Sequence, residues 1–381
     1  MLNLNTTEKN WASTAAARFE HKLRAVRERS AEKIPNRAVD GVHNNKIFEG
    51  DPDNADGICW WTNGFWAGML WQAYHATRDD RYAEIARFTE RTLDECFSCY
   101  YGLHHDVGFM WLPSAVADYR LTGNEKSRIR AMHAATLLAG RYNPNGHFLR
   151  AWNGDKTGWM IVDCLMNLSL LYWASDETGD PRYAEIAQNH ADTALRVLLR
   201  PDGSCNHIAV LDPVTGELTG APAGQGYAPG SSWSRGQSWA VYGFALSAKH
   251  TGEARYLEAA KRSAHYFIAN AATHNWEPLV DFLAPESPEL LDMSAGAIAA
   301  CGLLELEKQV SVYEKKLYHD AAEHLLSAIA KKHLDLAPET DGIVLDSTAD
   351  YHKDIHTRMI YADYYFVEGL LRLQGKEFFA W

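Results

Sequence analysis

Apolar residues recur at helical spacing along most of this chain, and two kinds of segment alternate. Segments such as 64–77 and 235–250 are apolar almost all round, which predicts helices buried on most sides. Segments such as 81–97 and 254–272 have one apolar face and one charged face. The pattern predicts helices near 10–32, 64–77, 81–97, 107–122, 125–141, 162–177, 182–199, 235–250, 254–272, 292–309, 312–334 and 360–374.

A weak repeat joins these segments in pairs. An apolar helix leads into a short turn, and a motif close to Arg-Tyr-Ala-Glu-Ile-Ala follows at 81–86, 182–187 and 255–260. Gly123, Gly179 and Gly252 stand where a left-handed residue would end the first helix. Because the turns are short, the two helices of each pair must run antiparallel.

The alternation of all-round and one-sided helices predicts two concentric rings. We therefore expect an all-α fold, an (α/α)6 barrel of six helical hairpins, as a single domain over residues 1–381. An open solenoid is the alternative, but its repeats would be more uniform in length. Long connections usually carry function, and these should gather at one end of the barrel; they lie at 34–63, 98–106, 142–161, 200–234, 273–291 and 335–359.

Composition narrows the class of protein. The net charge is -12 and no Lys/Arg-rich tract occurs, which argues against nucleic acid as a partner. The N-terminus has no apolar run and no stretch of 18 apolar residues exists, so we expect neither a secretory signal nor a membrane span, and a cytoplasmic location. The six cysteines are dispersed, and Cys96-x-x-Cys99 lacks the second pair of a zinc site, so we expect structural thiols.

One carboxylate stands out in an apolar segment. Residues 158–172 read as a buried helix with Asp163 in its middle. Burial raises the pKa of a carboxyl group, and an acid that is protonated near neutral pH is a common catalytic device. A structural carboxylate that caps or bridges helices is an equal alternative on this segment alone.

Further polar residues stand where the inner helices should begin. Asp106 is either the N-cap of a helix or a functional carboxylate. His104 and His105 precede it, but no third ligand follows at zinc spacing, so we expect no metal. Pro113 should kink this helix or mark its start. Arg235 should face inward, where it needs an anion from the protein or from a substrate.

Tryptophans and loop residues complete the candidate site. Trp61 belongs to a cluster that forms either a core or a wall for stacking a sugar, and the abundance of aromatic residues fits both. Trp152 is a second candidate wall residue, while His207 and Gln225 are either site residues or solvated loop residues. Together, these polar and aromatic residues at the expected beginnings of the inner helices are typical of a pocket for an acidic sugar.

These stretches resemble the unsaturated glucuronyl hydrolases of glycoside hydrolase family 88. The similar segments follow the family order over nearly the whole chain: 61–66, 104–109, 161–167, 230–239, 294–305 and 363–373. Two positions depart from the family pattern. Gly224 stands where the family often has a histidine, and 347–359 does not reproduce the Ser and Lys that some members use for substrate sulfate. The preferred linkage and sulfation are therefore left open.

The resemblance implies an (α/α)6 barrel, no metal or other cofactor, and release of Δ4,5-unsaturated glucuronic acid from lyase-generated glycosaminoglycan oligosaccharides. It implies that Asp163 is the catalytic acid/base and Asp106 a second essential carboxylate. It also implies a substrate site made of Trp61, His105, Trp152, His207, Gln225, Arg235 and Trp239. Such a substrate is a vinyl ether, so a single protonated acid can supply a proton to C4 and then activate water for C5.

Three alternatives are kept. An unsaturated rhamnogalacturonyl hydrolase would use the same chemistry on pectin fragments. A sugar epimerase on this barrel would need histidines on opposite sides of the substrate, and we expect the adjacent His104 and His105 to point in different directions. A glycan-binding protein without catalysis would tolerate loss of either aspartate. The expected partner is an unsaturated oligosaccharide, with neither nucleic acid nor membrane, and the chain is expected to be a monomer or a weak homo-oligomer.

Overall fold

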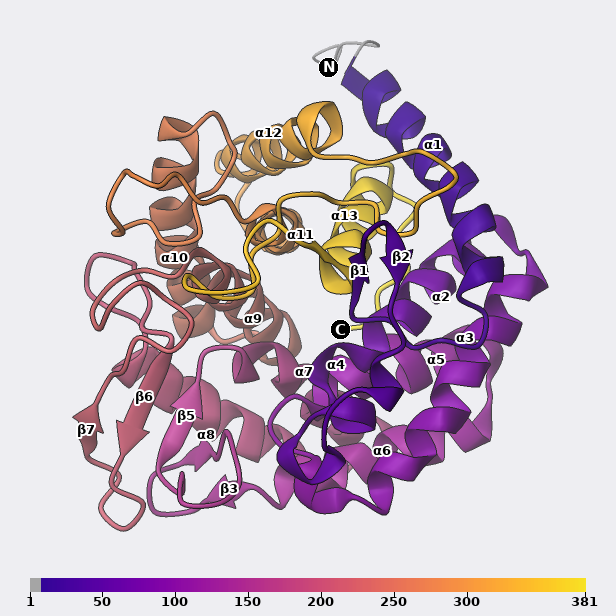
Figure 1. Ribbon diagram of the computed structural model, residues 1–381. Coiled ribbons are helices and arrows are strands. Elements are labelled where there is room, and N and C mark those ends of the chain that lie inside the picture. The colour runs from indigo at the N-terminus through magenta and orange to yellow at the C-terminus, as the bar shows by residue number, and fades with distance from the viewer. Residues whose placement is uncertain (1–7) are drawn as a thin grey trace.

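Helices form two concentric rings in the computed structural model, which describes residues 8–381 (Figure 1). The inner ring consists of α2 (Phe65–Thr77), α4 (Val107–Trp111) continued by η7 (Leu112–Val116) and α5 (Ala117–Thr122), α7 (Cys164–Thr178), α9 (Ser234–Thr251), α11 (Met293–Gln309) and α13 (Ile360–Leu373). The outer ring consists of α1 (Glu8–Arg29), α3 (Asp80–Leu93), α6 (Glu125–Ala139), α8 (Arg182–Val197), α10 (Ala254–Thr273) and α12 (Lys315–Lys332).

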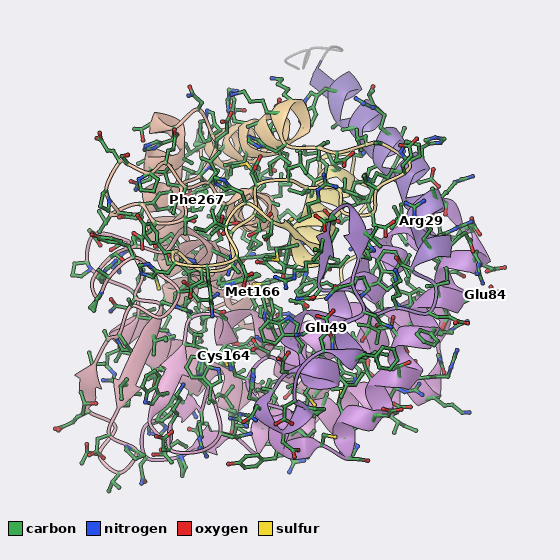
Figure 2. The ribbon with its side chains drawn as sticks, in the orientation of Figure 1. Arg29, Glu49, Glu84, Cys164, Met166 and Phe267 are labelled. Atoms are coloured by element: carbon green, nitrogen blue, oxygen red, sulfur yellow. The ribbon has the colours of Figure 1, made fainter. Side chains whose placement is uncertain are left out.

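Packing closes the inner ring. Each inner helix contacts the next, and the last, α13, packs against the first, α2. The inner helices are buried nearly all round, as in α9, where every residue from 234 to 248 is buried. Figure 2 shows Met166 of α7 near the middle of the ring and Glu84 of α3 at its outer edge. The all-α (α/α)6 barrel is confirmed and the solenoid is excluded, while the single domain over 1–381 stays a prediction.

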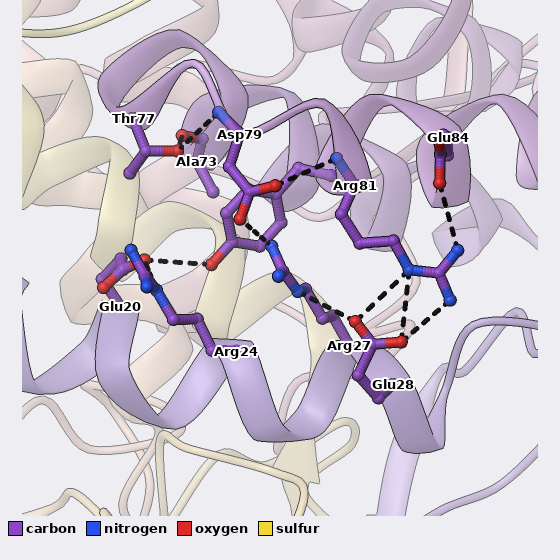
Figure 3. Close-up of polar contacts among 10 residues, drawn as sticks. Glu20, Arg24, Arg27, Glu28, Ala73, Thr77, Asp79, Arg81 and Glu84 are labelled. Carbon is purple, nitrogen blue, oxygen red and sulfur yellow. Dashed lines mark hydrogen bonds and ion pairs between the residues drawn. The ribbon is translucent and has the colours of Figure 1, made fainter.

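The first helix, α1, is fixed to the first hairpin by charged side chains (Figure 3). Arg27 Nη1 lies 2.6 Å from Asp79 Oδ2, and its guanidinium lies 4.2 Å from the centre of the Tyr82 ring. Arg81 Nη2 lies 2.8 Å from Glu28 Oε2. Since α1 also packs against α13, it completes the outer ring at the point where the inner ring closes.

The helix ends largely follow the predictions. Gly123, Gly179 and Gly252 have positive φ angles of 73°, 68° and 72° and end α5, α7 and α9 as expected. Pro113 lies inside the π-helical turn η7, so it distorts this helix and does not begin it. Segment 158–172 is only partly helical: a strand occupies its first part, and α7 begins at Cys164.

Short strands, which the apolar pattern did not predict, lie in the connections. One sheet holds β1 (Arg37–Val39), β2 (Val42–His43) and β8 (Arg358–Met359). A second pairs β3 (Tyr142–Asn143) with β4 (Phe148–Leu149), and a third holds β5 (Trp159–Ile161), β6 (Ile208–Leu211) and β7 (Leu218–Gly220). Strands β5 and β6 run antiparallel with Ile161 opposite Ile208. This register brings the residue before β6, His207, close to the start of α7.

Two further predictions concern surroundings of the protein. The prediction of no secretory signal rests on the N-terminal stretch. Residues 1–7 of that stretch lie outside the described residues. Within 8–381, no helix combines the length and apolar character that a membrane crossing requires. The six cysteines are free thiols, and all but Cys99 are buried.

Candidate active site

A cavity of about 470 Å³ lies among the connections that join the hairpins. Five of the six long connections line it, and only 273–291 supplies no lining residue. A cavity of this size and mixed polarity is typical of a small-ligand site. The predicted site residues that line it are Trp61, His105, Asp106, Trp152, Asp163, His207, Gln225 and Arg235.

Asp163 lies at the junction between β5 and α7. It is the N-cap residue of α7, but its side chain makes no capping hydrogen bond. The prediction that it lies in mid-helix is therefore wrong, because the apolar run that precedes it is strand β5. The residue is 9% exposed, and its Oδ1 lies 3.7 Å from His207 Nε2. Burial, and then the charge of Asp106, raise the pKa of Asp163 to about 7.

Asp106 has the opposite environment. It stands at the N-cap of α4, as the structural alternative predicted, but its carboxylate does not cap the helix. Its oxygens instead lie 3.2 Å from His104 Nδ1 and 3.1 Å from His105 Nε2. Burial opposes ionisation, yet the two histidines outweigh it and lower the pKa of Asp106. At slightly acidic pH the cavity therefore holds one ionised carboxyl group, Asp106, and one largely protonated carboxyl group, Asp163.

His105 supplies the positive charge that Asp106 needs. Its Nδ1 donates to the carbonyl of Ala151 at 2.9 Å while Nε2 faces Asp106. Burial works against the charged ring, but Asp106 outweighs burial and raises the pKa of His105. The His104 ring stacks on that of His105, with centres 4.9 Å apart and planes 19° from parallel. The expectation that the two adjacent histidines point in different directions is wrong, because both turn toward Asp106.

One group of side chains could hold a metal ion. Ligand atoms of His104, His105 and Asp106 lie within 4.8 Å of one another. The bond from Nδ1 to Ala151 is compatible with a metal at Nε2 of His105, but Asp106 already pairs with both rings and, against burial, raises the pKa of His105. We therefore assign the group to charge pairing, and the absence of a cofactor stays a prediction.

His207 faces Asp163 as a neutral ring. Its Nδ1 accepts the backbone N–H of Gln225 at 2.9 Å and lies 3.3 Å from the carbonyl of Ala223. The shorter contact assigns the ring proton to Nε2, the nitrogen nearest Asp163. Burial lowers the pKa of His207 to about 3. Gly224, one of the departures from the family pattern, has a φ of 61°, and a Cβ there would lie 2.0 Å from His207 Nδ1. The loop thus approaches His207 more closely than a residue with a side chain allows.

Arg235 forms an ion pair with a carboxylate of the protein itself. Its Nη1 lies 3.0 Å from Asp292 Oδ2, and its guanidinium also donates to the carbonyls of Thr348 and Ala349 at 2.5 and 2.6 Å. Gln225 Nε2 donates to the same Ala349 carbonyl at 2.5 Å. Both side chains therefore tie the loop 347–359 to the cavity wall.

The tryptophans divide between the wall and the core. Trp61 is half-buried and packs against Tyr361 and Phe109, with ring centres 5.0 and 5.4 Å apart. Trp152 meets His105 edge-on at 5.6 Å. Trp239 is fully buried and does not line the cavity, since it packs beneath Phe109 at 5.0 Å. The prediction that Trp239 contacts the substrate is wrong, and we assign it to the core.

Several lining residues had not been predicted. Most of them come from connections without a recognisable motif, while Trp60 neighbours Trp61 and Tyr361 belongs to the first turn of α13. Only the fold brings them all to the cavity. The most polar or aromatic of them are Arg37, Trp60, Lys156, Trp159, Asp350, Lys353, Asp354 and Tyr361. Lys156 Nζ lies 4.9 and 5.0 Å from the ring centres of Trp152 and Trp159.

Some buried polar atoms of the cavity lining have no hydrogen-bond partner within residues 8–381. They include Trp60 Nε1, Asp163 Oδ1, His207 Nε2, Arg235 Nε and the Tyr361 hydroxyl. An unpaired polar atom in a protein interior is costly, so such a group points to a ligand or solvent. Four of these residues can donate a hydrogen bond, which suits a ligand rich in oxygen atoms.

Comparison with known proteins agrees with this geometry. The model of Glycosyl Hydrolase Family 88 matches residues 26–377. The chain belongs to this family. It is 38% identical over 340 residues to the unsaturated glucuronyl hydrolase of Bacillus sp. (strain GL1), an alignment that covers 84% of this chain and 87% of the relative.

Solved structures of the family have the same fold. A crystal structure of the unsaturated glucuronyl hydrolase from Bacillus sp. GL1, described as responsible for glycosaminoglycan degradation, superposes with a TM-score of 0.87 and 33% identity, covering 96% of this chain and 97% of that one. An aspartate-to-asparagine variant of the Streptococcus agalactiae enzyme, complexed with dGlcA-GalNAc6S, gives a TM-score of 0.83 at 27% identity, covering 100% and 95%.

Proposed function

We propose that this family 88 glycosidase is an unsaturated glucuronyl hydrolase. Its substrates are lyase-generated glycosaminoglycan oligosaccharides, from which it releases the Δ4,5-unsaturated glucuronic acid at the non-reducing end. The observation that carries this proposal is the pair of carboxyl groups in one cavity, with Asp163 largely protonated at slightly acidic pH and Asp106 ionised. The names of the relatives in Bacillus and Streptococcus support the same substrate class.

The chemistry follows from the vinyl ether of the substrate. Asp163 gives its proton to C4, the C4=C5 electrons form the new C–H bond, and positive charge develops at C5, where the ring oxygen shares it. The Asp163 carboxylate then takes a proton from water as the water oxygen bonds to C5. The resulting hemiketal opens, and the remaining sugar leaves without direct attack at its anomeric carbon. The rule that links carboxylate separation to stereochemistry does not apply to this route.

The other residues of the site bind and orient the sugar. Trp61 and Trp152 are placed to pack against its faces. The unpartnered donors of His207, Arg235 and Tyr361 are placed to donate hydrogen bonds to its oxygen atoms. Burial, and then repulsion by the ionised Asp106 that pairs with His105, favour the protonated form of Asp163. This reaction requires no metal or organic cofactor.

The alternatives fit less well. Both histidines of the 104–105 pair turn to Asp106, and His207 faces Asp163, so neither of the pair stands free as the acid/base of an epimerase. A rhamnogalacturonyl hydrolase would share the reaction, and only the substrate distinguishes it. We further propose a single catalytic domain that acts in the cytoplasm as a monomer or weak homo-oligomer.

Unsaturated disaccharides test the function directly. The C4=C5 bond absorbs in the ultraviolet, and hydration removes this absorbance. Wild-type protein should therefore abolish the ultraviolet absorbance of unsaturated disaccharides from chondroitin, hyaluronan or heparin. In D2O, the product should carry deuterium at C4, where Asp163 delivers an exchangeable proton. Bleaching of pectin-derived fragments alone would favour the rhamnogalacturonyl alternative. No bleaching of any substrate in the panel would contradict the proposal.

A further inference from the structure

Asn167 joins the helices that carry the two carboxyl groups. It lies one turn into α7, is fully buried and does not line the cavity. Its Oδ1 accepts the backbone N–H of Phe109 at 2.8 Å, and its Nδ2 donates to the backbone carbonyl of Asp163 at 3.0 Å. Phe109 is in the first turn of α4, three residues after Asp106. One amide therefore connects the beginning of α4 to the beginning of α7.

The same contact depends on a glycine. Gly108 faces Asn167 so closely that a Cβ at this position would lie 2.6 Å from Asn167 Cα and 2.6 Å from its Oδ1. Because the first of these atoms is backbone, a larger residue at 108 would force the two helices apart. Gly108 sets how near α4 and α7 approach, and Asn167 holds them at that distance.

We propose that Asn167 is a positioning residue that fixes the separation of Asp106 and Asp163, with Gly108 as its counterpart on α4. The proposal rests on the proposed function and assigns a role to a residue outside the cavity. Asn167 touches neither carboxyl group, so its effect on the reaction is transmitted through the backbone of Asp163 and Phe109.

The separation matters because Asp163 responds to what surrounds it. Burial and Asp106 favour its protonated form, while His105 and Arg235 favour the ionised form. The titratable or charged groups that face it from the neighbouring elements are His105, Asp106, Cys164, Cys205, His207, Arg235 and Tyr361. If α4 moves away from α7, repulsion by Asp106 weakens and water gains access. Both changes lower the pKa of Asp163, and they outweigh the loss of the smaller opposing effect of His105, which moves together with Asp106.

Asn167→Ala and Gly108→Ala test this role by independent routes. We expect each to lower kcat/KM on an unsaturated disaccharide by roughly 10- to 100-fold, because misplacement of a catalytic group is costly. We also expect the alkaline limb of the kcat/KM profile, where Asp163 loses its proton, to move down by about half a pH unit or more. Gly108→Ala keeps the test valid if Asn167→Ala does not fold.

Gln237→Ala is the matched control. Gln237 is also a fully buried amide that joins two segments, since its Nε2 donates to the carbonyls of Gly203 and Ser263 at 2.8 and 3.1 Å, and it does not line the cavity. Its loss should reduce thermal stability and leave the pH profile in place. If the Asn167 and Gly108 variants behave like this control, with an unmoved alkaline limb, the positioning role is wrong.

A crystal structure of Asn167→Ala separates this proposal from the proposed function, because it requires no activity. A wider gap between the carboxyl groups of Asp106 and Asp163 than in wild type supports the role of Asn167, and an unchanged gap overturns it. Wild-type protein that fails on every unsaturated substrate contradicts the proposed function alone.

Discussion

Asp163 keeps its proton at the expense of stability at higher pH. Its pKa is about 7 in the folded protein and roughly 3.9 in an unfolded chain, so between these values the folded state binds more protons. The stability that the protonated group contributes is complete below about pH 4 and declines as the pH rises toward 7. Asp106 has the opposite sign, because its pKa is lowered in the folded state.

The first prediction follows from that difference. Asp163→Asn removes the titration but keeps the shape, so the variant should gain stability relative to wild type by on the order of 2–4 kcal/mol between pH 4 and pH 8. Urea unfolding at both pH values measures the change. A stability difference that does not change between pH 4 and pH 8 would show that the pKa of Asp163 is not raised in the folded protein.

The second prediction at this scale concerns Gly224. Alanine here would bring a Cβ within 2.0 Å of His207 Nδ1 at a φ of 61°. We expect His207 to be displaced and kcat/KM to fall by roughly 10-fold or more, since small misplacements at a site are costly. Gly220→Ala is the control, because a Cβ there meets no atom within 4 Å. Equal activity of the two variants would mean that His207 is not needed in its present position.

Single residues show where sequence reasoning about the site stops. The apolar pattern predicted Asp163 to be a buried acid. Strand β5 is as apolar as the helix after it, so the pattern could not predict that Asp163 is the N-cap residue of that helix. Trp239 carries the same aromatic signal as Trp61, and only packing distinguishes core from wall. The partner of Arg235 is Asp292, which lies 57 residues further along the chain. No local pattern connects them.

At the scale of elements, the helices could be predicted because their burial is periodic. The predicted 182–199, for example, is observed as Arg182–Val197, and 360–374 as Ile360–Leu373. The strands could not be predicted, because they are only two to four residues long and owe their existence to pairing between loops. Those loops form most of the cavity, so the site was predicted less completely than the barrel.

The third prediction concerns the attachment of α1. Arg27 is 13% exposed, pairs with Asp79 and stacks over Tyr82. Arg27→Ala should destabilise the protein by about 1–2 kcal/mol without changing kcat/KM, since the contact is remote from the cavity. Arg24→Ala on the same helix is the control, because Arg24 is 55% exposed and its ion pair is with Glu20 of α1 itself. Unfolding in urea compares them, and equal midpoints would show that α1 is not held by Arg27.

At the scale of the whole molecule, the barrel accounts for the chemistry by bringing distant loops to one end. Asp106, Asp163 and Arg235 each stand where an inner helix begins, and the ring brings those beginnings around one cavity. The sequence repeat predicted this arrangement, because paired helices of two burial types can close only as two rings. The repeat does not predict which helix beginnings face one another across the cavity, because that depends on how the ring closes.

The central claim is that the protonated Asp163, held between these elements, starts the reaction. The most direct test compares Asp163→Asn with Asp363→Asn. Asp363 is matched because burial also raises its pKa to about 7, but it accepts backbone N–H groups of Ile343 and Val344 and does not line the cavity.

The measurement is the loss of ultraviolet absorbance of an unsaturated glucuronyl disaccharide at pH 6. We predict a rate at least about 10³-fold lower for Asp163→Asn, because the asparagine can neither give a proton to C4 nor accept one from water. Asp363→Asn should retain most of the wild-type rate. Retained activity in folded Asp163→Asn would contradict the account.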